Sequence, residues 1–113
     1  TPGHTSCHTS FLLEELGILV TGDLFPAAKT PGRTDFPTGN IVQMKDSIQK
    51  VRALDLDTLI PSRGETIRGN AIEESLTKHL DFFDSMIEAK GMLPKEWPVP
   101  VPTCMWWTPE PEW

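Results

Sequence analysis

The chain has 113 residues, and ten Lys and Arg against sixteen Asp and Glu give a formal net charge of −6. A chain of this length buries about two-thirds of its unfolded surface, so we expect one domain with a modest core. The negative charge disfavours nucleic acid and anionic membranes as partners. Apolar runs are far shorter than the ~20 residues that cross a bilayer, so we expect a soluble protein. No signal-peptide pattern is present, which favours the cytoplasm over secretion, but a chain that begins at Thr1 can have lost such a signal, so the compartment stays open.

The amino-terminal part predicts a polar loop and a β-hairpin. Residues 1–9 are polar and hold two of the three histidines. Residues 10–15 are apolar enough for a strand, residues 16–17 are typical of a turn, and residues 18–21 have the β-branched side chains of a second strand. Asp23 then lies at the end of that strand.

The middle of the chain predicts a loop, a helix and a strand. Residues 24–40 contain three Pro and two Gly, which favours a long surface loop. Apolar residues then recur at intervals of three and four from Ile41 to Val51, which predicts an amphipathic helix. Residues 57–61 predict a short strand, and residues 62–69 predict another polar loop.

The carboxy-terminal part predicts a second helix and an extended tail. The helix begins with Asn70 as its cap, and His79 is expected as a partly buried or solvated structural residue beside its apolar stripe. The stripe consists of Ile72, Leu76, Leu80, Phe83 and Ile87. Residues 93–113 hold six of the eleven prolines and all four tryptophans. They indicate either a strap folded over the domain or a partner-binding tail.

This order of hairpin, helix, strand and helix predicts an α/β (α+β) layered domain over residues 1–92, followed by the tail of residues 93–113. The two helices cover one face of the sheet. The other face needs a cover from elsewhere.

Two residues stand where chemistry is possible. His4 lies in a loop with Pro2 and Gly3, which can fix the direction of its imidazole, although a surface histidine without a ligand is the alternative. Asp23 ends a buried strand, a position where metal ligands and catalytic acids collect. A turn or capping carboxylate is the alternative for Asp23.

Two motifs in this order carry a resemblance. The run Thr1-Pro2-Gly3-His4-Thr5 with His8, and the run Val20-Thr21-Gly22-Asp23-Leu24-Phe25, resemble the second half of metallo-β-lactamase-superfamily hydrolases, which include glyoxalase II-like thioesterases and lactonases. The resemblance covers residues 1–92 and implies half of a four-layer αββα sandwich.

The same resemblance implies a metal site. In this family the histidine at the position of His4 binds zinc or iron, and the aspartate at the position of Asp23 bridges two such ions. A metal-activated water then attacks the carbonyl of a small-molecule ester, thioester or lactone. The family histidine that matches His8 supports the site without binding metal, and a polar-loop residue with no role in the site is the alternative for His8.

The chain departs from the family pattern in two ways. Arg63, in Ile60-Pro61-Ser62-Arg63-Gly64, stands where the family has a second-site histidine, and a guanidinium has no lone pair for a metal. The family signature His-x-His-x-Asp-His is absent. We therefore expect an incomplete active site, with His4 and Asp23 as metal ligands and Asp23 and Arg63 as candidate catalytic residues.

Two interpretations follow. In the first, the chain is a fragment of a hydrolase, inactive alone, and Arg63 stabilises an anionic substrate or oxyanion in the complete protein. In the second, it is a non-catalytic binding or structural half-domain in which Arg63 pairs with Asp23 in place of metal. Because an approximate two-fold relates the halves of the family sandwich, we expect a homodimer or a missing amino-terminal half to cover the bare sheet face.

Overall fold

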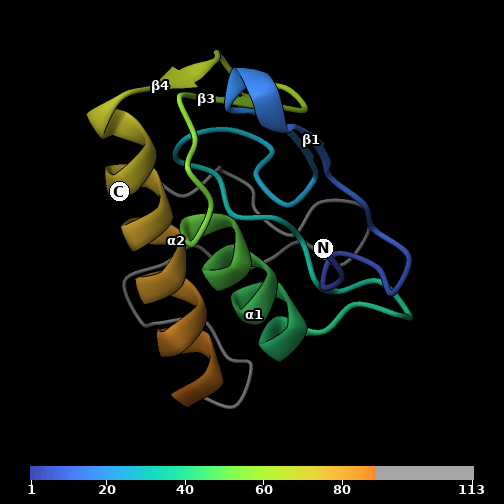
Figure 1. The fold of residues 1–113 in the computed structure, drawn as a ribbon. Helices are drawn as coiled ribbons and strands as arrows, with labels where there is room; N and C mark the ends of the chain where they lie inside the picture. Colours follow the sequence, from blue (N-terminus) through green and yellow to red (C-terminus); the bar gives the residue numbers. More distant parts are fainter. Residues whose placement is uncertain (89–113) are drawn as a thin grey trace.

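The computed structural model describes residues 1–88, and the predicted tail of residues 93–113 lies outside these described residues. In chain order the elements are β1 (Phe11–Leu13), the 3-10 turn η1 (Glu14–Leu16), β2 (Ile18–Gly22), α1 (Ile41–Arg52), β3 (Thr58–Pro61), β4 (Ile67–Arg68) and α2 (Asn70–Glu88). Figure 1 shows α1 and α2 lying side by side. None of the described helices combines the length and hydropathy needed to span a bilayer.

The predicted hairpin is confirmed with a shorter first strand. β1 pairs antiparallel with β2, and Leu13 faces Ile18 across the pair. That register leaves a four-residue connection, so Glu14 and Glu15, which the sequence assigned to the strand, lie in η1 instead. Gly17 ends the turn with φ at 62°, a left-handed conformation that glycine adopts without strain.

The sheet has the order β1-β2-β3-β4. β2 and β3 are parallel, and α1 lies in the connection between them, as a parallel pair requires a crossover. β4 pairs antiparallel with β3 in a region that the sequence predicted as loop only. This strand has two residues, too few to produce a pattern of alternation.

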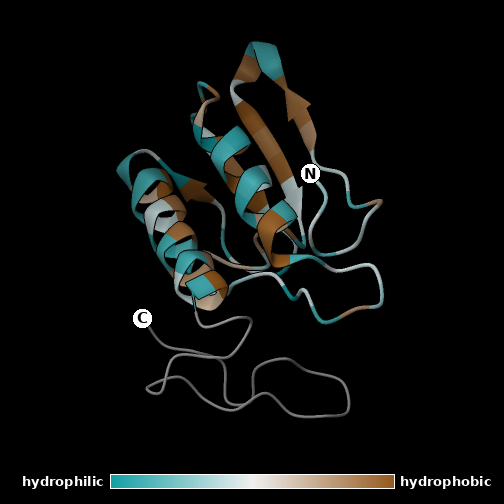
Figure 2. Cartoon of the chain, turned by 90° about the horizontal axis from the view of Figure 1, so that it is seen from below, coloured by the Kyte–Doolittle hydropathy of each residue, from teal (hydrophilic) through white to brown (hydrophobic). Residues whose placement is uncertain are grey.

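The core lies between the sheet and the two helices. The strands contribute Leu19, Leu59 and Ile67, α1 contributes Met44, Ile48 and Val51, and α2 contributes Ile72, Leu76, Leu80, Phe82, Phe83 and Met86. Both helices are therefore amphipathic as predicted, and Figure 2 shows their hydrophilic outer faces beside a hydrophobic β2. The side chain of Asn40 caps α1 by accepting a hydrogen bond from the backbone of Gln43.

The opposite face of the sheet is open, as predicted. Phe11, Val20 and Ile60 are cross-strand neighbours in one row, on the side away from the row of Leu12, Leu19 and Leu59, in which Leu19 and Leu59 are buried and Leu12, on the edge strand, is exposed. Phe11 is 67 % exposed, and Ile60 and Leu13 are also exposed. We call Phe11, Leu13, Val20 and Ile60 the open face.

Candidate metal site at the ends of β2 and β3

The predicted site residues lie together where β2 and β3 end. Because these strands are parallel, the residues that follow them emerge at the same edge of the sheet. His4 Nε2 lies 3.5 Å from Asp23 Oδ2, and Arg63 Nη2 lies 3.7 Å from Asp23 Oδ1. The hydroxyl of Ser62 donates a hydrogen bond of 2.8 Å to Asp23 Oδ1. Asp23 is thus the centre of the cluster.

The loop that carries His4 is held against the start of α1. The backbone N–H of Asn40 donates to the carbonyl of Gly3, and the hydroxyl of Ser47 donates to the carbonyl of Pro2. Gly3 has φ at 140°, and a Cβ at this position would collide with the backbone of Met44. This close approach explains why the motif needs glycine before His4.

The hydrogen bond of His4 determines which ring nitrogen has a free lone pair. Nδ1 lies 2.8 Å from the carbonyl oxygen of Arg33, which can only accept, so Nδ1 carries the proton. In the neutral ring Nε2 then presents a lone pair to Asp23 Oδ2. Two tetrahedral zinc ligands at about 2.0–2.2 Å from the metal lie roughly 3.4 Å apart, so the separation of these two donors fits one bound ion.

Asp23 is positioned by the turn that ends β2. The buried hydroxyl of Thr21 contacts the carbonyl oxygens of Phe25 and Ile60, which ties the turn to the end of β3. Leu24 and Phe25 are fully buried directly after Asp23. The carboxylate is therefore held at the surface of a rigid turn, with its side chain 32 % exposed.

Arg63 is presented by an anchored loop. The backbone N–H groups of Arg63 and Gly64 both donate to the carbonyl oxygen of Pro26, at 3.0 and 3.1 Å. A Cβ on Gly64 would lie 2.7 Å from Cβ of Ala27, so the two loops approach as closely as glycine allows. The Arg63 side chain is 68 % exposed and pairs with Asp23 without replacing the hydrogen bond from Ser62.

The other two histidines differ in location. His8 lies beside His4 with ring centroids 5.8 Å apart, and burial lowers its pKa while a hydrogen bond to the carbonyl of Thr1 opposes the shift. His79 lies in α2 and is fully buried, more than the partly buried or solvated position that the sequence predicted. Its ring nitrogens contact the carbonyls of Ser75 and Thr30, which places it in the core and away from Asp23.

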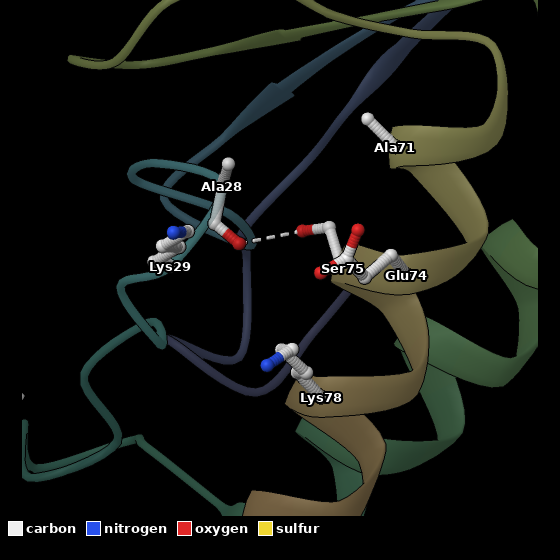
Figure 3. A pocket seen from close by; sticks show the side chains of 6 residues that line it. All are labelled: Ala28, Lys29, Ala71, Glu74, Ser75 and Lys78. Carbon is white, nitrogen blue, oxygen red and sulfur yellow. Dashed lines mark hydrogen bonds between the residues drawn. The ribbon is translucent and has the colours of Figure 1, made fainter. Parts of the chain in front are cut away.

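A pocket of about 80 Å³ lies between the 24–40 loop and α2 and is separate from these residues (Figure 3). Ala28, Lys29, Ala71, Glu74, Ser75 and Lys78 line it. The hydroxyl of Ser75 is directed to the carbonyl of Ala28 and donates to it at 2.7 Å. The pocket shares no residue with the site.

Two parts of the site were missed from the sequence. For the hydrogen bond from Ser62 to Asp23, the only indication in the sequence was that Ser62 is next to Arg63. No feature of the sequence indicated the contact of His4 with the Arg33 carbonyl. Within residues 1–88, no group of three or more His, Cys, Asp or Glu is arranged to hold a metal ion. The described part of the chain offers two donors to a metal, fewer than the three or four of protein zinc sites.

A mixed sheet with helices on one face and a His–Asp pair at its strand ends constitutes a partial metallo-β-lactamase fold. The pattern of the metallo-beta-lactamase superfamily matches residues 1–66, more than half of the chain, and includes His4, Asp23 and Arg63. The chain therefore belongs to the metallo-beta-lactamase superfamily, a group of proteins that generally bind metal ions.

Two relatives are similar to part of the chain. A probable metallo-hydrolase of Methanocaldococcus jannaschii is 38 % identical over 69 residues, which cover 58 % of this chain and 32 % of that protein. An uncharacterized protein of Aquifex aeolicus is 39 % identical over 61 residues, which cover 53 % of this chain and 28 % of that protein. The chain thus matches about a third of the length of these relatives.

Proposed function

We propose that this chain is the carboxy-terminal part of a metal-dependent hydrolase that cleaves an ester, thioester or lactone bond in a small molecule. Membership of the superfamily and the likeness to a probable metallo-hydrolase support a metal-dependent hydrolase. The observation that carries the proposal is the distance of 3.5 Å between His4 Nε2 and Asp23 Oδ2. We propose these two atoms as ligands of zinc or iron.

Each residue of the cluster has a distinct task in this proposal. The Arg33 carbonyl keeps the His4 proton on Nδ1, and the Ser62 hydroxyl occupies Asp23 Oδ1, so that Oδ2 remains for the metal. A bound metal would supply an activated water and polarise the substrate carbonyl. The exposed guanidinium of Arg63 can donate to an anionic group of the substrate or to a developing oxyanion.

The remaining ligands must come from outside residues 1–88. The matched relatives are about three times as long as the matched segment, so a complete protein has room for a second half with further ligands. That half would also cover the open face of the sheet. We expect the isolated chain to bind metal weakly and to hydrolyse nothing at a measurable rate.

The contact of Arg63 with Asp23 favours a second candidate function. At 3.7 Å the guanidinium is placed to neutralise the carboxylate, as a non-catalytic half-domain without metal would require. Such a module would act in binding or assembly. The two candidates differ in whether His4 and Asp23 take up a cation.

Metal binding tests the first candidate directly. Zinc and iron would be measured in the purified chain by plasma mass spectrometry, and Co²⁺ titrations would follow the visible spectrum. We expect His4→Gln and Asp23→Asn each to weaken Co²⁺ binding at least about tenfold, because each removes one of two donors. Asp46→Asn, which changes an exposed carboxylate on α1, is the matched control and should bind as the wild type does. Absence of saturable binding would favour the second candidate.

A further inference from the structure

We infer that Arg33, Asp35 and Phe36 form a clamp that holds the His4 ring in the Nδ1–H tautomer and directs Nε2 at Asp23. We call these three residues the clamp; they are positioning residues and none of them is proposed to bind metal. The inference deepens the proposed function, because it names the residues that prepare one ligand. Its effect on the His4 ring can be observed in the absence of any metal.

The contact at the centre of the clamp joins distant parts of the chain. His4 Nδ1 donates to the carbonyl of Arg33, 29 residues away, at 2.8 Å. This carbonyl belongs to the breaker-rich loop of residues 24–40, which has no regular element to fix its path. A loop carbonyl can select a tautomer only if other contacts hold the loop in place.

The Arg33 side chain supplies the first of these contacts. Its Nε and Nη2 donate to the two carboxylate oxygens of Asp35 at 2.8 and 2.7 Å, a bidentate pair that fixes the local backbone. These hydrogen bonds lower the pKa of Asp35, so the carboxylate is charged at neutral pH. Arg33 Cζ also lies 4.5 Å from the centroid of the Phe36 ring, within cation–π distance.

Phe36 connects this pair to the histidine. Its ring meets the His4 ring edge to face, with centroids 4.8 Å apart and an interplanar angle of 76°. The guanidinium, the phenyl ring and the imidazole are therefore in sequential contact, and the Arg33 carbonyl returns to the same imidazole. His4 is held both through its ring and through its Nδ1 proton.

The end of the loop is anchored beside His4 as well. The carbonyl of Phe36 accepts from the backbone of Gly39 at 2.8 Å, and Asn40 donates to the carbonyl of Gly3 at 2.8 Å. The loop thus returns to the residue that precedes His4. The tautomer of a metal-binding histidine is set by the partner of its other nitrogen, so this arrangement prepares Nε2 for a cation before one binds.

Long-range ¹H–¹⁵N correlation spectra of the histidine rings test the clamp in the metal-free chain. The chain has three histidines, and His4→Gln identifies the signals of His4. We expect the wild type to show His4 as Nδ1–H at a pH where its ring is neutral. Asp35→Asn and Phe36→Leu should each remove at least about half of that tautomer in favour of Nε2–H. Arg33→Lys, which keeps the charge and loses the bidentate geometry, should have an intermediate effect.

The matched control removes a similar ion pair elsewhere. Glu73→Gln breaks the pairing of Arg52 with a carboxylate between α1 and α2 and should leave the His4 tautomer unchanged. The signals of buried His79 report in every variant whether the core remains folded. A wild-type His4 in the Nε2–H form, or unchanged His4 signals in Asp35→Asn and Phe36→Leu, would overturn the inference. Clamp variants that change the tautomer in a chain without saturable Co²⁺ binding would support the clamp and favour the non-catalytic half-domain over the hydrolase.

Discussion

Two histidines have opposite surroundings: His4 lies at the surface beside the ends of β2 and β3, and His79 is buried in the helical layer. His79 is 0 % exposed, and its ring joins Ser75 of α2 to Thr30 of the 24–40 loop. His4 bonds one carbonyl with Nδ1 and turns Nε2 to a carboxylate at the surface. Both rings use one nitrogen to contact a carbonyl, and they differ in the partner of the other nitrogen. In His79 this partner is a second carbonyl, which makes the residue structural, whereas in His4 it is a surface carboxylate, which makes the residue a candidate ligand.

Alanine substitutions of His79 and His4 should lower the free energy of unfolding by different amounts. We expect His79→Ala to lower the free energy of unfolding by about 2–4 kcal/mol, because it opens a cavity and removes the ring that contacts the Ser75 and Thr30 carbonyls, to one of which the neutral imidazole can donate. His4→Ala should cost about 1 kcal/mol, since it removes one partly exposed hydrogen bond. Urea unfolding followed by circular dichroism measures both values. Equal losses would show that the His4 loop belongs to the structural core.

The two faces of the sheet offer a second contrast, which concerns the predicted homodimer. We expect Phe11→Asp to weaken self-association at least about a hundredfold, because it places a charge on the open face where a second copy would bury a large apolar side chain. Val42→Asp changes an exposed apolar residue on α1 and is the matched control. Multi-angle light scattering over a concentration series measures the effect. A monomeric wild type would contradict the dimer and favour the other predicted cover of the open face, an amino-terminal half.

The pH dependence of stability should reflect the buried histidine. Burial lowers the pKa of His79 from its ordinary value of 6.5, so the unfolded chain binds more protons than the native chain below that value. The contribution of His79 to the free energy of unfolding is therefore fully present above pH 6.5 and is lost by up to ~1.4 kcal/mol per pH unit as the pH decreases towards the native pKa.

Two variants test which histidine causes this change in the free energy of unfolding with pH. Denaturant titrations at several pH values should show that His79→Gln removes most of the slope. His8, whose pKa is also lowered by burial, is less buried, so His8→Gln should remove less. A slope that persists in His79→Gln would show that another group dominates the titration.

The sequence predicted those features whose signals are local. The periodicity from Ile41 to Val51 and the stripe from Ile72 onward predicted α1 and α2, and the β-branched run after residue 17 predicted β2. β4 was missed because it exists only through its pairing with β3. The metal-binding roles of His4 and Asp23 were predicted from a family resemblance, and the proximity of these residues depends on parallel strands that periodicity alone does not reveal.

The partners of the site residues were the least predictable part. Ser62 bonds Asp23 across 39 residues of sequence, and the Arg33 carbonyl reaches His4 through the path of a loop without regular structure. A backbone carbonyl carries no residue-specific signal, so no motif could have indicated it. The boundary at residue 92 and the role of the tail stay predictions.

The smallest expected effect concerns the different contacts of the two carboxylate oxygens of Asp23. Oδ1 contacts Ser62 and Arg63, whereas Oδ2 faces His4, and only Oδ2 is proposed to bind metal. Arg63→Met should tighten Co²⁺ binding about two- to fivefold, because an exposed, solvent-screened unit charge beside the site is worth ~0.5–1 kcal/mol of repulsion. Arg63→Lys keeps the charge and should bind as the wild type does, and added salt should reduce the difference between the two variants. If Arg63→Met weakened the affinity instead, the guanidinium would act by holding Asp23 in place, and its contribution would be structural and not a competing charge.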